Sequence, residues 1–261
     1  MSSGKYIDKL KGSRILIFGA TSGIGFGILE ASVEYGATVI ISGSNESKLS
    51  RAIEKLKASH PKLSNGKIKS QVCDLSHTDT LEANLTSLLA FATNNGVDKL
   101  NHIAFTAGDA LPLKPLTEIT PDYIQQAGVV RFITPLMLAK LVPTYMVQSP
   151  DSSITITSGV IGAKPAPGWT ITAAYSSAQE GLARGLAVDL APVRVNCVSP
   201  GSVKTELLAG AADEVLEYMR LATLTQRLGR PEDLAEVYLY AMKDGFVTGS
   251  TLHSNGGRLL V

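Results

Sequence analysis

The stretch RILIFGATSGIG, residues 14–25, joins a short apolar run to a glycine-rich turn. Beyond the turn, apolar side chains recur at helical spacing, at Ile24, Ile28, Leu29 and Val33, so the sequence predicts a strand, a tight turn and a helix. Glycine lets the backbone turn sharply and approach a ligand closely, and the free N–H groups at a helix N-terminus favour a phosphate. The stretch therefore predicts a phosphate-binding turn at the start of an α/β fold.

Six further short runs of apolar and β-branched residues follow, separated by segments of helical period rather than by tight hairpins. Nearly continuous apolar runs are typical of parallel strands that are covered on both faces. We therefore predict a Rossmann-type, doubly wound α/β fold with a seven-stranded parallel sheet, helices on both faces and a ligand at the carboxyl ends of the strands. The predicted strands are 14–18, 38–42, 68–73, 100–105, 154–158, 193–198 and 250–253.

Composition sets the broad class. The chain has 261 residues, 44% of them hydrophobic and 18% charged, and shows no repeat or linker, so we expect one domain over residues 1–261. With 24 basic and 23 acidic residues and no long run of either sign, neither nucleic acid nor an anionic membrane is expected as a partner. The sequence shows no secretory signal and no run of about 18 apolar residues, which predicts a cytoplasmic protein without a membrane span.

Neither the cysteines nor the histidines indicate a metal site. Cys73 and Cys197 lie in strand-like runs, where buried thiols are expected as core residues in a reducing compartment. The four histidines have no metal-ligand spacing, so we expect no bound metal.

Two irregular segments are candidates for substrate contact. Residues 159–168, GVIGAKPAPG, contain two prolines and three glycines, which predicts a loop rather than a continuing helix. Residues 202–224 follow Pro200-Gly201, where we expect a substrate lid.

The spacing of Gly19, Gly23 and Gly25 resembles the TGxxxGxG motif of the short-chain dehydrogenase/reductase family. Further landmarks of that family follow in order over nearly the whole chain: FTAG at 105–108, PGSVKT at 200–205 and RLGRPED at 227–233. The resemblance implies a nicotinamide dinucleotide cofactor, a small-molecule substrate and a homodimer or homotetramer. The cofactor contacts implied are Gly19, Thr21, Ser22, Gly23, Ile24, Gly25, Ser42, Ser44, Asn45, Asp74, Leu75, Ala107, Gly108, Pro200, Gly201, Val203 and Thr205.

The end of the second strand predicts which dinucleotide is used. An NAD enzyme presents a carboxylate there to the ribose 2′-hydroxyl, but this chain has Ser42-Gly43-Ser44-Asn45 and no acid. Hydroxyl, amide and backbone donors, helped by Lys48, can bind a 2′-phosphate, so we predict NADP(H). Alternatively, these residues only turn the chain, with Asn45 or Ser47 capping the next helix.

The catalytic residues depart from the family pattern. Relatives use a serine at the end of strand five, a tyrosine about 13 residues later and a lysine four after that; Ser158 fits the first role. Tyr175 is the candidate tyrosine, but Gln179 stands where the lysine would follow. A second alignment, anchored on LARGLAVDLAP, puts Thr172 and Ser176 at the two positions.

All four residues (172, 175, 176 and 179) share one helix face. Tyr175 can therefore face the pocket as a catalytic residue, or pack in a contact between subunits.

Arg131 is the third catalytic candidate. It falls at or beside the family's asparagine, within a helix predicted over about 121–146. Facing the pocket, it would donate hydrogen bonds to a substrate carbonyl or carboxylate but would not release a proton. The alternative is a surface arginine.

VRF, TSG and PAPGW together resemble a divergent branch of the family that lacks the tyrosine and lysine. That branch includes fungal NADPH-dependent reductases of indole-alkaloid pathways, some of which also steer a [4+2] cycloaddition and carry an aspartate where this chain has Ala166. We expect an NADP(H)-dependent reductase of a largely apolar carbonyl, imine or iminium. The alternative is an NADP(H)-binding protein with little redox activity, acting as a cyclase or isomerase pocket or as a cofactor-sensing module.

Overall fold

The computed structural model describes residues 4–61, 66–109, 111 and 113–261. Its centre is one seven-stranded sheet in the order β3-β2-β1-β4-β5-β6-β7, with every neighbouring pair parallel. This confirms the predicted doubly wound fold. The strands are β1 (Arg14–Phe18), β2 (Thr38–Gly43), β3 (Ile68–Val72), β4 (His102–Phe105), β5 (Ser153–Thr157), β6 (Arg194–Pro200) and β7 (Thr251–Ser254).

Two strand ends differ from the prediction by two residues, and the other ends by at most one. Strand β6 continues to Pro200 because its last residues pair with β7 up to Ser254. Strand β4 begins only at His102; Leu100 instead forms an isolated bridge with Met146, at the end of a neighbouring helix.

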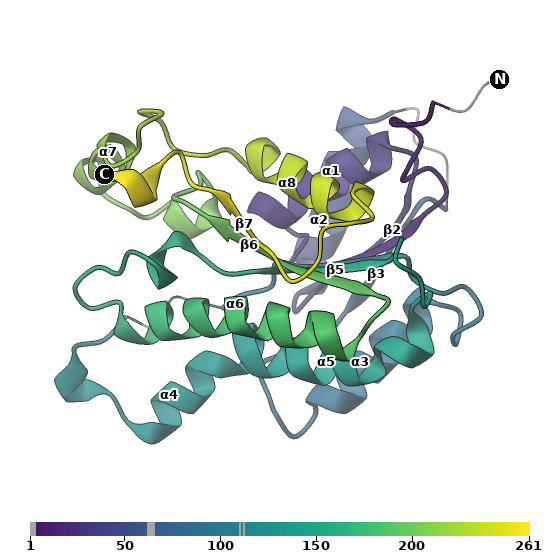
Figure 1. The fold of residues 1–261 in the computed structure, drawn as a ribbon, viewed down its shortest axis with the longest axis horizontal. Helices are drawn as coiled ribbons and strands as arrows, with labels where there is room; N and C mark the ends of the chain where they lie inside the picture. Colours follow the sequence, from purple (N-terminus) through teal and green to yellow (C-terminus); the bar gives the residue numbers. More distant parts are fainter. Residues whose placement is uncertain (1–3, 62–65, 110, 112) are drawn as a thin grey trace.

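Helices cover both faces of the sheet (Figure 1). One face carries α1 (Gly23–Glu34), α2 (Glu46–Ser59) and α8 (Pro231–Lys243). The other carries α3 (Leu81–Ala92), α4 (Pro121–Gly128), α5 (Thr134–Tyr145) and α6 (Thr170–Asp189). Short helix α7 (Asp213–Leu221), within the predicted lid, lies beside the chain's C-terminus.

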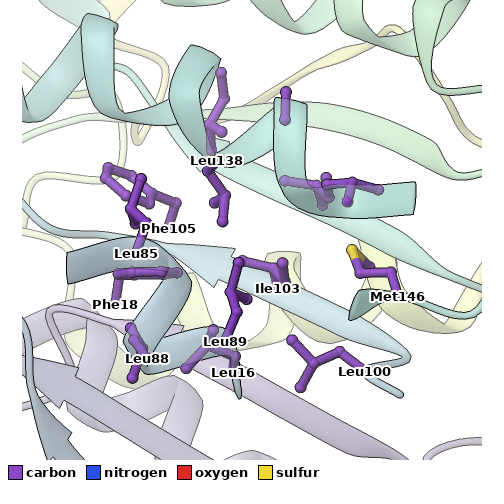
Figure 2. Packing of buried hydrophobic residues seen from close by; sticks show 14 of the residues in the cluster. Leu16, Phe18, Leu85, Leu88, Leu89, Leu100, Ile103, Phe105, Leu138 and Met146 are labelled. Carbon is purple, nitrogen blue, oxygen red and sulfur yellow. The ribbon is translucent and has the colours of Figure 1, made fainter. Parts of the chain in front are cut away.

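The sheet is buried on both faces because consecutive strand residues point to opposite sides. In β1, Leu16 and Phe18 pack under α3 and α5 (Figure 2), whereas Ile15 and Ile17 pack under α1 and α8. All four side chains are at most 1% exposed. This two-sided burial explains why the strands are apolar without alternation.

The helix predicted over 121–146 is interrupted. Helices α4 and α5 are joined by a π-helical turn, η2 (Val129–Ile133). The combined 25-residue helix is long and apolar enough to cross a membrane by length and composition, which no apolar run in the sequence had indicated. Half of its most apolar window is buried in the fold, as expected of a core helix.

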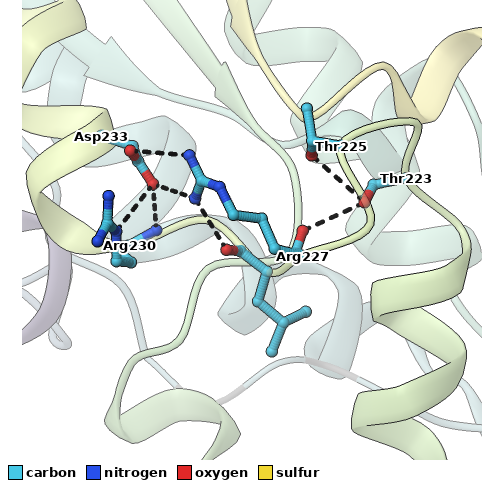
Figure 3. A network of polar contacts seen from close by, with 6 residues as sticks. Thr223, Thr225, Arg227, Arg230 and Asp233 are labelled. Atoms are coloured by element: carbon cyan, nitrogen blue, oxygen red, sulfur yellow. Dashed lines mark hydrogen bonds and ion pairs between the residues drawn. The ribbon is translucent and has the colours of Figure 1, made fainter.

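An ion-pair network joins residues 223–227 to α8 (Figure 3). Arg227 donates two hydrogen bonds to the Asp233 carboxylate, at 2.5 and 3.0 Å, and the Arg230 backbone N–H donates a third, at 2.8 Å. These contacts, Arg227 first, lower the pKa of Asp233 to about 2. The network fixes the point where the segment after α7 enters α8.

Arg194, at the start of β6, is the group whose removal we expect to destabilise the fold. Its guanidinium is buried and donates to the carbonyls of Pro150, Ala241, Met242 and Val247. Arg194→Met leaves these carbonyls without their donor, and should lower the free energy of unfolding by about 3 kcal/mol. Arg184→Met, on the exposed face of α6, is the control and should cost less than about 0.5 kcal/mol in the same guanidinium chloride titration. Equal losses would contradict this role.

Candidate functional site

A cavity of about 700 Å³ opens at the carboxyl ends of the strands. It begins at the glycine-rich turn after β1, passes the end of β2 and reaches Arg131 and Thr157. Its volume lies within the range of known cofactor pockets, and its position is the one where ligands bind in doubly wound sheets.

The glycine-rich turn is built so that only glycine fits. Gly19 has a φ of +78° and Gly23 a φ of +53°, a region that favours glycine. A Cβ on Gly25 would overlap the Gly19 carbonyl oxygen, so α1 can lie directly against the turn. Its first turn carries no acidic residue, and the Ser22 side chain makes no capping hydrogen bond. The start of α1 lines the cavity, with Thr205 and Glu206 beside Gly23. Its backbone N–H groups fit the pyrophosphate of a dinucleotide.

Polar groups line the cavity beyond the turn. Asp74 accepts hydrogen bonds from the Ser76 hydroxyl (2.6 Å) and backbone N–H (2.9 Å), which lower the pKa of its carboxyl and keep it charged. Asn45 caps α2 by accepting from the Lys48 N–H at 2.9 Å. Asn45 and Lys48 also line the cavity, so the capping role and a ligand contact coexist.

Most predicted cofactor residues meet around this one cavity. Its lining includes Gly19, Thr21, Ser22, Gly23, Ile24, Gly25, Ser42, Ser44, Asn45, Asp74, Leu75, Ala107, Gly108 and Thr205. Three others lie outside the lining. Pro200 ends β6, Gly201 borders a second cavity of about 500 Å³, and Val203 is buried in the core and bridged to Gly229.

Ser158 does not line the cavity. Its hydroxyl donates to Glu180 of α6 at 3.4 Å. The preceding residue, Thr157, lines the cavity instead, and donates to the Phe105 carbonyl at 2.6 Å. The Thr157 hydroxyl also bonds the hydroxyl of buried Tyr238 of α8, whereas the Ser158 side chain points to the opposite face of the sheet, toward α6.

Tyr175 also lies outside the cavity lining. Its hydroxyl donates to the Ile124 carbonyl of α4 at 2.8 Å, and its ring packs on Phe132 with the centroids 6.0 Å apart. Partial burial raises the pKa of Tyr175, the opposite of what a proton donor needs near neutral pH. Within this chain, Tyr175 therefore contacts α4 and the π-helical turn η2.

The face of α6 is as predicted in one respect, because Thr172, Ser176 and Gln179 are all buried. None of the four residues 172, 175, 176 and 179 carries a charge that could take the place of the family's lysine. Gln179 instead donates from Nε2 to the Arg131 carbonyl at 2.9 Å.

Arg131 is the predicted catalytic residue that the structure places in the cavity. Its guanidinium lies against the Cα of Gly108, where a Cβ would come within 2.8 Å of three of its atoms. It donates to the Asp109 carbonyl at 2.5 Å, and Nε lies 3.3 Å from the Asp109 carboxylate. The Nε–H is not directed at that oxygen and makes no hydrogen bond, so the carboxylate contact is electrostatic.

Burial lowers the pKa of Arg131, and the contacts with Asp109 offset only part of that shift. The guanidinium nevertheless remains charged. With the side chain 23% exposed, the alternative of a free surface arginine does not hold.

Several features of the site were not predicted. Thr157 and Glu206 line the cavity, and the π-helical turn carries Arg131. The turn had a sequence signal in Pro135, which has no N–H to donate to the carbonyl four residues earlier. In the described ranges, no group of three or more His, Cys, Asp or Glu side chains could hold a metal ion.

Comparison with known proteins identifies the family. A model of the SDR-like Rossmann domain matches residues 6–261. The short-chain dehydrogenase/reductase malC of Malbranchea aurantiaca is 43% identical, covering 97% of both chains, and fsr5 of Gibberella fujikuroi is 41% identical, covering 99% of both. The solved structure of the MalC reductase/Diels-Alderase matches with a TM-score of 0.92 at 43% identity, over 98% of this chain and 100% of that one. The chain therefore belongs to the short-chain dehydrogenase/reductase family of oxidoreductases, which bind a nicotinamide cofactor and act on small molecules.

Proposed function

We propose that this protein is an NADP(H)-dependent reductase of a carbonyl, imine or iminium group in a small to medium, largely apolar metabolite. One observation carries the proposal: a single cavity has the glycine-rich turn at one end and the guanidinium of Arg131 at the other. The cofactor, when bound, supplies a hydride. The residues of this chain hold it and polarise the substrate.

Arg131 sets the kind of chemistry. Its charge and N–H groups stabilise negative charge that develops on a substrate oxygen. It cannot act as a proton donor near neutral pH, and the Tyr175 hydroxyl is bonded to Ile124 outside the lining. Hydride addition to an iminium gives a neutral amine with no proton to be delivered, and an imine reaches the same product once it is protonated to the iminium. Reduction of an iminium therefore suits this site better than reduction of a ketone, whose oxygen must be protonated. Ser158 and Tyr175 have no direct part in this proposal.

The preference for NADP(H) is proposed from the β2 end of the cavity. Ser44, Asn45 and Lys48 line it there and none is acidic. A 2′-phosphate would meet a cation and polar donors instead of the carboxylate that selects NAD.

A second function is supported by the relative described as a reductase/Diels-Alderase, which matches nearly the full chain. On this alternative, the cavity binds NADP(H) with little redox turnover and serves as a cyclase pocket. Stoichiometric oxidation of NADPH by a substrate distinguishes the two functions. We further propose a cytoplasmic homodimer or homotetramer in which residues 202–224 cover the bound substrate.

Gly25→Ala tests the cofactor cradle. Because the added methyl overlaps the Gly19 carbonyl, the turn and α1 must separate, and we expect NADPH affinity to fall at least about 100-fold in a fluorescence titration. Gly185→Ala is the matched control, because a Cβ there meets nothing within 4 Å on α6. The control should bind NADPH normally and gain up to about 1 kcal/mol of stability. Parental affinity in Gly25→Ala would place the cofactor elsewhere.

Lys48→Ala tests the choice of cofactor. Loss of one charge-assisted contact to the 2′-phosphate should weaken NADPH binding about tenfold and leave NADH binding unchanged. Lys57→Ala, in the last turn of the same helix, should change neither. An equal loss of affinity for NADPH and NADH would show that Lys48 does not contact the 2′-phosphate.

Arg131→Met tests the reductase itself. Single-turnover oxidation of bound NADPH by a panel of cyclic imines and ketones should slow about 100-fold, because a fixed donor to the reacting group is lost. Tyr175→Phe should keep the parental rate. If Tyr175→Phe abolishes ketone reduction, the tyrosine mechanism is right. If the parent binds NADPH but none of the imines or ketones in the panel causes its oxidation, the cyclase alternative is favoured.

A further inference from the structure

The helix that carries Arg131 has lost one of its own hydrogen bonds at that residue. In an α-helix the Arg131 carbonyl would accept from the N–H of residue 135, but that residue is Pro135 and has none. The backbone adapts by a π-helical turn in which the Thr134 N–H donates to the Val129 carbonyl, five residues back. The Thr134 hydroxyl adds a second bond to the same carbonyl, at 2.9 Å.

Gln179 supplies the missing donor from the neighbouring helix. Its Nε2 donates to the Arg131 carbonyl at 2.9 Å, and the residue is only 3% exposed. A buried carbonyl without a partner is costly, so this bond favours the π-helical turn over rearranged alternatives. One turn earlier on α6, Tyr175 bonds the Ile124 carbonyl in the same way.

We propose that Gln179 is a positioning residue for Arg131. By holding the Arg131 carbonyl, it fixes the turn from which the side chain reaches over Gly108 to Asp109. The neutral amide suits this task, since a lysine at the same place would bring a second buried cation next to the guanidinium. The inference rests on the proposed function, in which Arg131 contacts the substrate.

The test is a double-mutant cycle with Gln179→Met, which keeps the side-chain length and removes the donor. In the parent background, Gln179→Met should lower kcat about tenfold, with KM and the NADPH dissociation constant within about twofold. In the Arg131→Met background it should cause no further loss, because it acts through Arg131. Tyr175→Phe is the matched control: it removes the other bond between α6 and a helix carbonyl and should leave kcat unchanged.

Amide hydrogen exchange gives a readout that does not depend on turnover. Gln179→Met should speed exchange of the backbone amides at 132–134 and 136, whereas Tyr175→Phe should not. Gln179→Glu, which keeps the shape and replaces the donor by an acceptor, serves if Gln179→Met does not fold. Additive losses in the cycle, or unchanged exchange at 132–134 and 136, would overturn the proposal. If Arg131→Met has the parental rate, the role of Arg131 in the proposed function fails, and exchange alone decides whether Gln179 holds the turn.

Discussion

The structure depends on one steric constraint, the absence of space for a Cβ where β1, α1 and β4 meet. Gly25 of α1 lies against the Gly19 carbonyl, and Gly19 lies against the backbone of Ala107 after β4. Because Gly19 and Gly25 carry no side chain where these three segments meet, the N-terminus of α1 reaches the strand ends. The sheet order places β1 between β2 and β4, so successive connections leave in opposite directions and open a crevice there. The cavity and its positive end follow from that contact.

At the Arg131 end of the cavity, the constraint is that buried backbone carbonyls need hydrogen-bond donors. Pro135 and the π-helical turn remove the usual partner of the Arg131 carbonyl, and α6 supplies another through Gln179. Residues at the positions of a catalytic pair in relatives thus serve here as hydrogen-bond donors to a neighbouring helix.

The sequence predicted the fold and the cofactor end of the site for the same reason: both depend on local patterns. The strands are buried on both faces, so their apolar runs marked them to within two residues. The glycine-rich turn needs glycine for its own backbone geometry. Ser158 and Tyr175 were placed on the right elements, but their directions depend on Glu180 and Ile124, which are distant in the sequence. No local pattern contains such partners.

Arg131 shows what a buried cation implies for a substrate. A guanidinium in a cavity raises the cost of bringing a second positive charge close, unless a carboxylate offsets it. Asp109 is that carboxylate: it lies 3.3 Å from Arg131 and its side chain is still 39% exposed. Glu206, another acid in the lining, lies at the opposite end of the cavity, beside Gly23. Near Arg131 the site therefore offers one carboxylate and one guanidinium, so an iminium meets compensating charge, and a neutral carbonyl meets a donor. The Asp109 carboxylate offsets the charge of Arg131, so the arginine is compatible with the cationic iminium substrate of the proposed function.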